Sequence, residues 1–214
     1  MKITHNHIIE AIAFVVSLIY WKDIRKGHLK VLPFFLFFIL CIELMGTYFK
    51  SVPYANAKLY NISIPIEYFF YLLLFRLHGG VWQRKYIMAA IFGFFCLTTY
   101  YFITSPIHVF HSKVLLCGTA MVVIASCIYL FEKFRSVEEH SLLSDPFFWI
   151  ATGLLLFNLE DFAYFFLYDM INLNNWDRYD QWFKAINNSL LVLLYLSYIV
   201  AIVICHKNRS RHAK

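Results

Sequence analysis

Residues 30–49 read KVLPFFLFFILCIELMGTYF, and within this run only Lys30 and Glu43 are charged. A transmembrane α-helix needs about 20 mainly apolar residues to cross a hydrocarbon core about 30 Å thick. The stretch therefore predicts a membrane-spanning helix. The whole chain has the same character, because 61% of its 214 residues are hydrophobic and only 15% are charged. Soluble domains carry about 25% charged residues.

Apolar stretches near this length recur along the chain and predict an all-α, seven-transmembrane-helix bundle that forms a single domain over residues 1–214. Turn and capping residues separate them, for example Gly79-Gly80 and Ser105-Pro106. Pro146 directly follows the capping acid Asp145, as at the start of a helix. This class excludes nucleic-acid binders, secreted disulfide scaffolds and ordinary cytosolic enzymes. The predicted spans are residues 6–21, 30–49, 61–77, 86–104, 113–132, 146–168 and 182–205.

The distribution of Lys and Arg predicts how the bundle is inserted, because cytoplasmic loops carry an excess of these residues. With the N-terminus outside, thirteen of the 19 cations fall on the inner side and six on the outer side. The N-terminus is therefore predicted outside and the C-terminus in the cytoplasm, in a cell inner membrane. The net charge of +6 then anchors the inner face to anionic lipid. The inner cations are Lys22, Arg25, Lys26, Lys30, Arg76, Arg84, Lys85, Lys133, Arg135, Lys207, Arg209, Arg211 and Lys214.

Acids and amides inside the spans are the candidate ligand-binding residues, because an ionisable side chain there costs about 2.5–3.5 kcal/mol on insertion scales. From the helical rise of about 1.5 Å per residue, five different spans bring such groups to roughly 6–10 Å below the outer surface. We therefore predict an acidic pocket in the outer half of the bundle, above an apolar inner half. The alternative is that these groups only form hydrogen bonds between helices. The set comprises Glu10, Glu43, Glu67, Asn158, Glu160, Asp161, Asn187 and Asn188.

Metal and disulfide chemistry are not predicted. The five cysteines (Cys41, Cys96, Cys117, Cys127 and Cys205) all lie within spans, where they act as small apolar residues. His5, His7, His108 and His111 fall on the outer side, and the His108-x-x-His111 spacing would suit a transition metal together with Glu10. Solvated loop histidines are the simpler interpretation. We expect neither a metal site nor a cofactor.

Two stretches resemble known membrane proteins. Residues 56–71, NAKLYNISIPIEYFFY, and residues 145–150, DPFFWI, followed by Gly153-Leu154-Leu155, are similar to segments of uncharacterised bacterial seven-helix integral membrane proteins. This resemblance covers about 30 residues. It implies a stand-alone seven-helix module and carries no assigned activity.

A second resemblance is to the two-repeat membrane lycopene cyclases, whose helices open with a Pro-x-Glu-(Glu/Asp)-x-x-Phe motif in each half. Residues 65–70, PIEYFF, keep Pro65 and Glu67 but have Tyr68 in place of the second acid. Residues 159–164, LEDFAY, keep both acids, but Asn158 stands in place of the proline and the motif lies well inside its span. The resemblance implies Glu67, Glu160 and Asp161 as general acids that protonate an isoprenoid double bond.

The sequence favours a non-enzymatic, receptor-like or regulatory accessory membrane protein. The segments between the inner ends of the spans are short, the longest being residues 133–145, so a signal would pass to a cytoplasmic or membrane protein partner. The other expected partners are the lipid bilayer and a second copy of the chain, but no nucleic acid. Small residues for close helix contact in such a homo-oligomer are Gly118, Ala120, Ala125 and Ser126. The alternatives are an ion or proton channel or transporter, and the isoprenoid cyclase.

Overall fold

The structure is a computed structural model that describes residues 5–25, 27–50, 52–135, 142–173 and 181–212. Helices are the secondary structure of this described part, and it contains no strand. Of the cations counted above, Lys2, Lys26, Arg178 and Lys214 lie outside it. The elements are α1 (His5–Ile19), α2 (Trp21–Ile24), η1 (His28–Val31), α3 (Leu32–Phe49), α4 (Pro53–His78), α5 (Val81–Thr104), α6 (Ser112–Arg135), η2 (Leu142–Ser144), α7 (Pro146–Leu173) and α8 (Gln181–His212).

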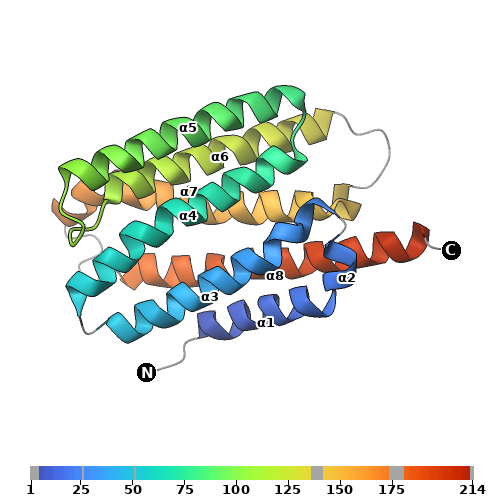
Figure 1. Ribbon diagram of the computed structural model, residues 1–214, viewed down its shortest axis with the longest axis horizontal. Coiled ribbons are helices and arrows are strands. Elements are labelled where there is room, and N and C mark those ends of the chain that lie inside the picture. Colours follow the sequence, from blue (N-terminus) through green and yellow to red (C-terminus); the bar gives the residue numbers. More distant parts are fainter. Residues whose placement is uncertain (1–4, 26, 51, 136–141, 174–180, 213–214) are drawn as a thin grey trace.

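The long helices α1 and α3–α8 run side by side along one common direction, and the chain begins and ends at opposite ends of the bundle (Figure 1). α8 contacts α1 and α7, and α7 in turn contacts α6. α4 packs against α3, α5 and α6. α5 contacts α4 and α6 and therefore lies at the edge of the bundle. α4 joins α3 to α5 and α6, and α8 joins α1 to α7.

Five helices of the described residues are long and apolar enough to cross a membrane: His28–Phe49, Gln83–Thr104, Ser112–Arg135, Pro146–Tyr168 and Gln181–Arg211. The prediction of a multi-pass helical membrane protein is thus supported by length and composition. Of the other two predicted spans, α1 is an apolar helix of only 15 residues. α4 is long, but polar residues such as Asn61 and Glu67 interrupt its apolar sequence.

Four helices extend well beyond the predicted spans. α4 begins at Pro53 instead of residue 61 and α5 at Val81 instead of residue 86. α7 ends at Leu173 instead of residue 168, and α8 covers Gln181–His212 instead of residues 182–205. The apolar window marks only the part of a helix that suits lipid. The backbone ladder of hydrogen bonds continues into polar sequence until a residue or a tertiary contact ends it.

The start of α7 is as predicted. Asp145 Oδ1 accepts a hydrogen bond from the Phe147 backbone N–H at 2.9 Å, and Pro146 occupies the first turn. Asp145 Oδ2 also accepts a hydrogen bond from the Tyr129 hydroxyl at 3.0 Å and lies 2.7 Å from Lys133 Nζ. This one carboxylate therefore caps α7 and ties it to the end of α6.

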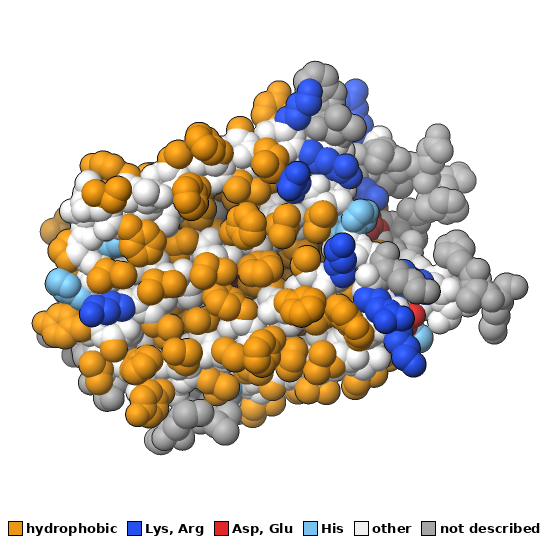
Figure 2. Space-filling model, in the orientation of Figure 1, with side chains coloured by type: hydrophobic (Ala, Val, Ile, Leu, Met, Phe, Trp, Pro, Cys, Tyr) orange, Lys and Arg blue, Asp and Glu red, His pale blue; other side chains and the backbone are white. Residues whose placement is uncertain are grey.

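The surface of the bundle suits a bilayer. Large apolar side chains are exposed along the helices, and Figure 2 shows them covering most of one face. On this face, most of the Lys and Arg side chains gather toward the end of the molecule at which the chain ends. The described cysteines are all free.

Small residues serve helix packing inside the chain. Gly118 of α6 is buried against the ring of Tyr68 of α4, and Gly153 of α7 lies against Ser197 of α8. Ala125 and Ser126 are buried as well. Three of the four small residues predicted to serve an oligomer contact thus pack within the described bundle, and oligomerisation itself stays a prediction.

Asn61 fastens α4 to the connection between α5 and α6. Its amide nitrogen donates to the carbonyl oxygens of Ile107 and Val109 at 2.8 and 2.7 Å, and its amide oxygen accepts from the His111 backbone N–H at 2.9 Å. The side chain is buried. It satisfies three backbone groups of a segment that has no helical ladder of its own.

The substitution Asn61→Leu is therefore expected to lower the free energy of unfolding by about 2–4 kcal/mol, because each of three hydrogen bonds contributes about 0.5–1.5 kcal/mol. Denaturation of the purified protein in mixed micelles measures this effect. Asn188→Leu is the matched control, since Asn188 is exposed and accepts one hydrogen bond, from Asn6 at 2.7 Å. Equal losses in the two variants would contradict this role of Asn61.

Candidate functional site

Three carboxyl groups from three helices meet in the interior of the bundle. Glu10 of α1, Glu43 of α3 and Glu67 of α4 interact electrostatically with one another. Glu10 is only 1% exposed, and its Oε2 atom has no hydrogen-bond partner within the described residues. Carboxylates close together in a poorly solvated environment repel one another strongly. The packing of α1, α3 and α4 at this site therefore depends on how many of the three carboxyl groups are charged.

Tyrosine side chains surround these acids. The Tyr71 hydroxyl donates to Glu67 Oε1 at 2.6 Å, and the Tyr60 hydroxyl lies 3.4 Å from both carboxylate oxygens of Glu43. From α8, Tyr195 interacts electrostatically with all three acids and Tyr198 interacts with Glu67. His7 of α1 interacts with Glu43 and forms a hydrogen bond with the Thr47 hydroxyl at 2.9 Å. We call Glu10, Glu43, Glu67 and these tyrosines the acid cluster.

A second polar group adjoins the acid cluster on α7 and α8. The amide nitrogen of Asn187 lies 3.3 Å from Asp161 Oδ1 and 3.4 Å from Glu160 Oε2. Asp161 is buried and interacts electrostatically with Glu67. Glu160 is half-buried and lines a groove of about 370 Å³ between α7 and α8, together with Tyr164. Adjacent acids on one helix thus have different surroundings, as a separation of about 100° predicts.

The structure brings together most of the residues that the sequence singled out. Glu10, Glu43 and Glu67 interact electrostatically with one another, Asp161 interacts with Glu67, and Glu160 and Asn187 adjoin Asp161. Within the described residues, neither Asn158 nor Asn188 forms a hydrogen bond to these acids. Asn158 is buried and donates to the Leu154 carbonyl of its own helix at 2.9 Å, whereas Asn188 is exposed and bonds to Asn6.

The acid cluster is closed around Glu10, because packed side chains leave this residue almost no exposure. The tyrosines that complete it were not among the predicted site residues. Their spacing was a usable signal: Tyr71 lies one helical turn after Glu67, and Tyr195 and Tyr198 lie three residues apart on one face of α8. In an aromatic-rich chain, however, such spacing is also typical of ordinary core residues.

The predicted histidine alternative does not assemble in the described residues, which contain no group of three or more His, Cys, Asp or Glu side chains that could hold a metal ion. His108 packs near Tyr54, with ring centroids 5.9 Å apart, while His111 is buried next to Tyr101 and Phe102. His5 is exposed at the start of α1.

Hydroxyl groups in the apolar part of the bundle bond to their own helices. Thr98, Thr119 and Ser126 donate to the carbonyl oxygens of Phe94, Leu116 and Val122 at 2.8–2.9 Å. Each of these hydroxyl groups therefore bonds within its own helix. A channel or transporter would need them to line a polar path through the membrane.

No family model, no curated protein and no solved structure matches this chain.

Proposed function

We propose that the chain crosses the cell inner membrane seven times, with its N-terminus outside and its C-terminus in the cytoplasm. The five apolar helices support this topology, and α1 and α4 pack along them. The beginning and the end of the bundle lie at opposite ends (Figure 1), as an odd number of crossings requires. The gathering of Lys and Arg near the C-terminal end supports the direction of insertion.

We further propose that the protein is a receptor-like or regulatory accessory membrane protein whose acid cluster responds to protonation and which acts through a partner protein. One observation carries the proposal: the buried Glu10 and the half-buried Glu43 and Glu67 come from three helices and interact electrostatically with one another. A change in the charge of this site alters the repulsion between α1, α3 and α4. Because Glu10 is buried at 1% exposure, a proton fits the site better than a large ligand.

α1 connects the acid cluster to the opposite, basic end of the bundle. Directly after α1, the Tyr20 ring packs on the ring of His206 of α8 with centroids 4.7 Å apart, and Asp23 Oδ2 lies 2.6 Å from His206 Nδ1. Arg209 Nη1 donates to the Lys22 carbonyl at 3.3 Å. A displacement of α1 would therefore shift α2 against the end of α8, where a cytoplasmic partner would bind. This coupling needs two arrangements of α1 that differ in their affinity for protons.

The experiment is hydrogen exchange of the full chain in lipid nanodiscs, compared between about pH 5 and about pH 8 after correction for intrinsic rates. In the wild type, we expect the protection of residues 20–25 to change with pH. Glu10→Gln and Glu67→Gln should each abolish this change while insertion is retained, because Gln cannot ionise. His108→Asn is the matched control, an exposed titratable residue in the connection between α5 and α6. A response that persists unaltered in both cluster variants would overturn the proposal.

A second candidate is an isoprenoid cyclase, and one observation favours it. Asp161 interacts electrostatically with Glu67, so the two partial motifs lie near each other in the bundle although 94 residues separate them. Buried carboxyl groups at this position would serve as general acids toward a double bond. Expression in a lycopene-producing host with pigment analysis distinguishes the candidates. Cyclised pigment that disappears in Glu67→Gln would select the enzyme.

A further inference from the structure

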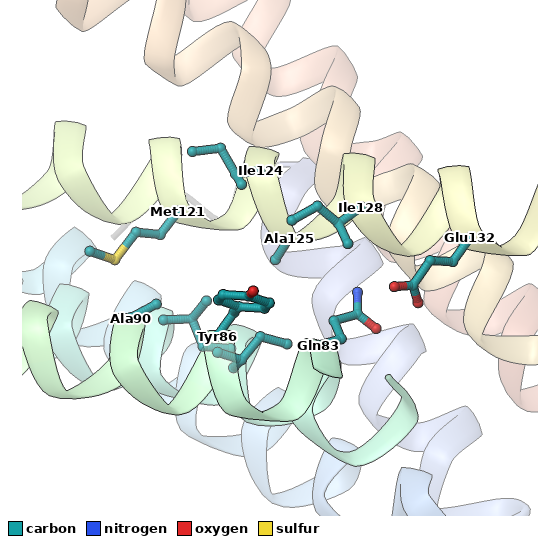
Figure 3. A pocket seen from close by; sticks show the side chains of 10 residues that line it. Gln83, Tyr86, Ala90, Met121, Ile124, Ala125, Ile128 and Glu132 are labelled. Carbon is teal, nitrogen blue, oxygen red and sulfur yellow. The ribbon is translucent and has the colours of Figure 1, made fainter. Parts of the chain in front are cut away.

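A crevice lies between α5 and α6, away from the acid cluster. It has a volume of about 250 Å³, and its walls are mainly apolar. Figure 3 shows Tyr86 and Ala90 of α5 facing Met121, Ile124 and Ile128 of α6 across it. Two polar side chains, Gln83 and Glu132, stand at one end and point toward each other. One end of the crevice is therefore polar, and the rest of its length is apolar.

The side chain of Gln83 is the first observation that points to a binding site. Its side chain is 2% exposed, and neither the amide nitrogen nor the amide oxygen has a hydrogen-bond partner within the described residues. Buried amides are almost always paired, because removing them from water without a partner is unfavourable. The amide oxygen lies where a Cβ atom at Gly79 would stand, so this glycine leaves room for it. The site therefore presents one unused donor group and one unused acceptor.

Glu132 provides a charge at the mouth of the crevice. It is exposed, and among the described residues no ion pair or hydrogen bond engages it. A Cβ atom at Gly80, the residue before α5, would lie 3.8 Å from Glu132 Oε2. Glu132 Oε2 therefore lies beside the N-terminal end of α5. A cationic group of a ligand that enters the crevice can pair with this carboxylate.

The length of the crevice matches the thickness of one leaflet of a bilayer. From Glu132 to Met121 the crevice follows α6 for eleven residues, or about 16 Å at about 1.5 Å per residue. This length is half of a hydrocarbon core about 30 Å thick. The outer walls are open to the surroundings of the bundle, since Tyr86 is 67% exposed and Ile124 is 59% exposed. An occupant can therefore enter sideways from the lipid.

We infer that the crevice binds one membrane lipid whose head group carries a primary ammonium, with one acyl chain lying between α5 and α6. The ammonium group pairs with the Glu132 carboxylate and donates to the Gln83 amide oxygen. The Gln83 amide nitrogen donates to a phosphate or ester oxygen of the same lipid. The apolar wall from Ile128 to Met121 covers the chain. This inference rests on the membrane placement proposed above and is independent of the acid cluster.

Native mass spectrometry of the full chain tests the inference. The purified protein is offered an equimolar mixture of ethanolamine-, choline- and glycerol-headed phospholipids with identical acyl chains. We expect one ethanolamine lipid to be retained with about fivefold or greater preference over the glycerol lipid, the effect of one favourable ion pair. The choline lipid should bind more weakly than the ethanolamine lipid, because its quaternary ammonium has no N–H group for Gln83.

Three variants separate the contributions of head group and chain. Glu132→Gln should remove the head-group preference, and Gln83→Leu should reduce retention of all three lipids. Ala125→Phe should fill the crevice and prevent retention. Thr99→Ala, on another face of α5, is the control and should behave as the wild type. Equal retention of the three head groups by the wild type, or an unchanged preference in Glu132→Gln, would overturn the inference even if Gln83→Leu fails to fold.

Discussion

Gly118→Val is expected to lower the free energy of unfolding by about 3 kcal/mol or more, and it is the most damaging single substitution that we predict. A Cβ atom at this position would lie 2.6 Å from Cγ of Tyr68 and 2.7 Å from Cε2. The ring of Tyr68 is buried between α4, α5 and α6 and packs edge-on against Phe94, so it has no space into which to move. α6 must then separate from α4. Overpacking of a core costs about 1–3 kcal/mol for a few atoms and more when the backbone has to shift.

Gly93→Val provides the matched control for this prediction. Gly93 lies in the middle of α5, and a Cβ atom there would meet no other atom within 4 Å. Both variants replace a helical glycine by the same residue, so the difference between them measures the collision with Tyr68 alone. Unfolding in mixed micelles, followed by circular dichroism, supplies the two free energies. Tyr68→Ala should partly rescue Gly118→Val, and similar stabilities of the two valine variants would contradict the close packing of α4 on α6.

Asp145→Ala is expected to lower the free energy of unfolding by about 2–3 kcal/mol at neutral pH. Removal of a helix-capping carboxylate costs about 1 kcal/mol. Loss of the hydrogen bond from Tyr129 adds about 1 kcal/mol, because the hydroxyl is left without this partner. The ion pair with Lys133 contributes at most about 1 kcal/mol, because Lys133 is 39% exposed and solvent screens the pair. Denaturation of the wild type and the variant at neutral pH measures the loss.

The contribution of Asp145 depends on pH. Partial burial by itself would raise the pKa of Asp145, but Lys133, the Phe147 N–H and the Tyr129 hydroxyl outweigh it, so the pKa lies below its ordinary value of 3.8. A depressed pKa means that the carboxylate stabilises the fold fully above pH 3.8 and loses this effect as the pH falls through the folded-state value. The stability difference between the wild type and Asp145→Asn should therefore be constant at higher pH and shrink in acid. A difference that grows in acid would contradict this assignment.

A large part of the candidate site could be predicted from the sequence, because acidic side chains are unusual within apolar stretches. An acid in an apolar stretch is conspicuous, so Glu10, Glu43, Glu67 and Asp161 could be selected by composition alone. The helical rise also placed them at similar depth, and their mutual interactions are a consequence of that depth. Depth does not fix rotation about the helix axis, however. For this reason Asn188, at the same predicted depth, lies on an exposed face and bonds to Asn6.

The amino-acid sequence by itself determined the helical class, the apolar surface and the cap at Asp145, because these depend on local composition and on hydrogen bonds between residues close in the chain. It marked the apolar core of each helix but not the helix ends, since a helical backbone continues into polar sequence. Only the tertiary structure decided which residues face one another. The tyrosines around the acids, the fit of Gly118 against Tyr68 and the unpaired amide of Gln83 all depend on contacts between separate helices, and no local pattern encodes these contacts.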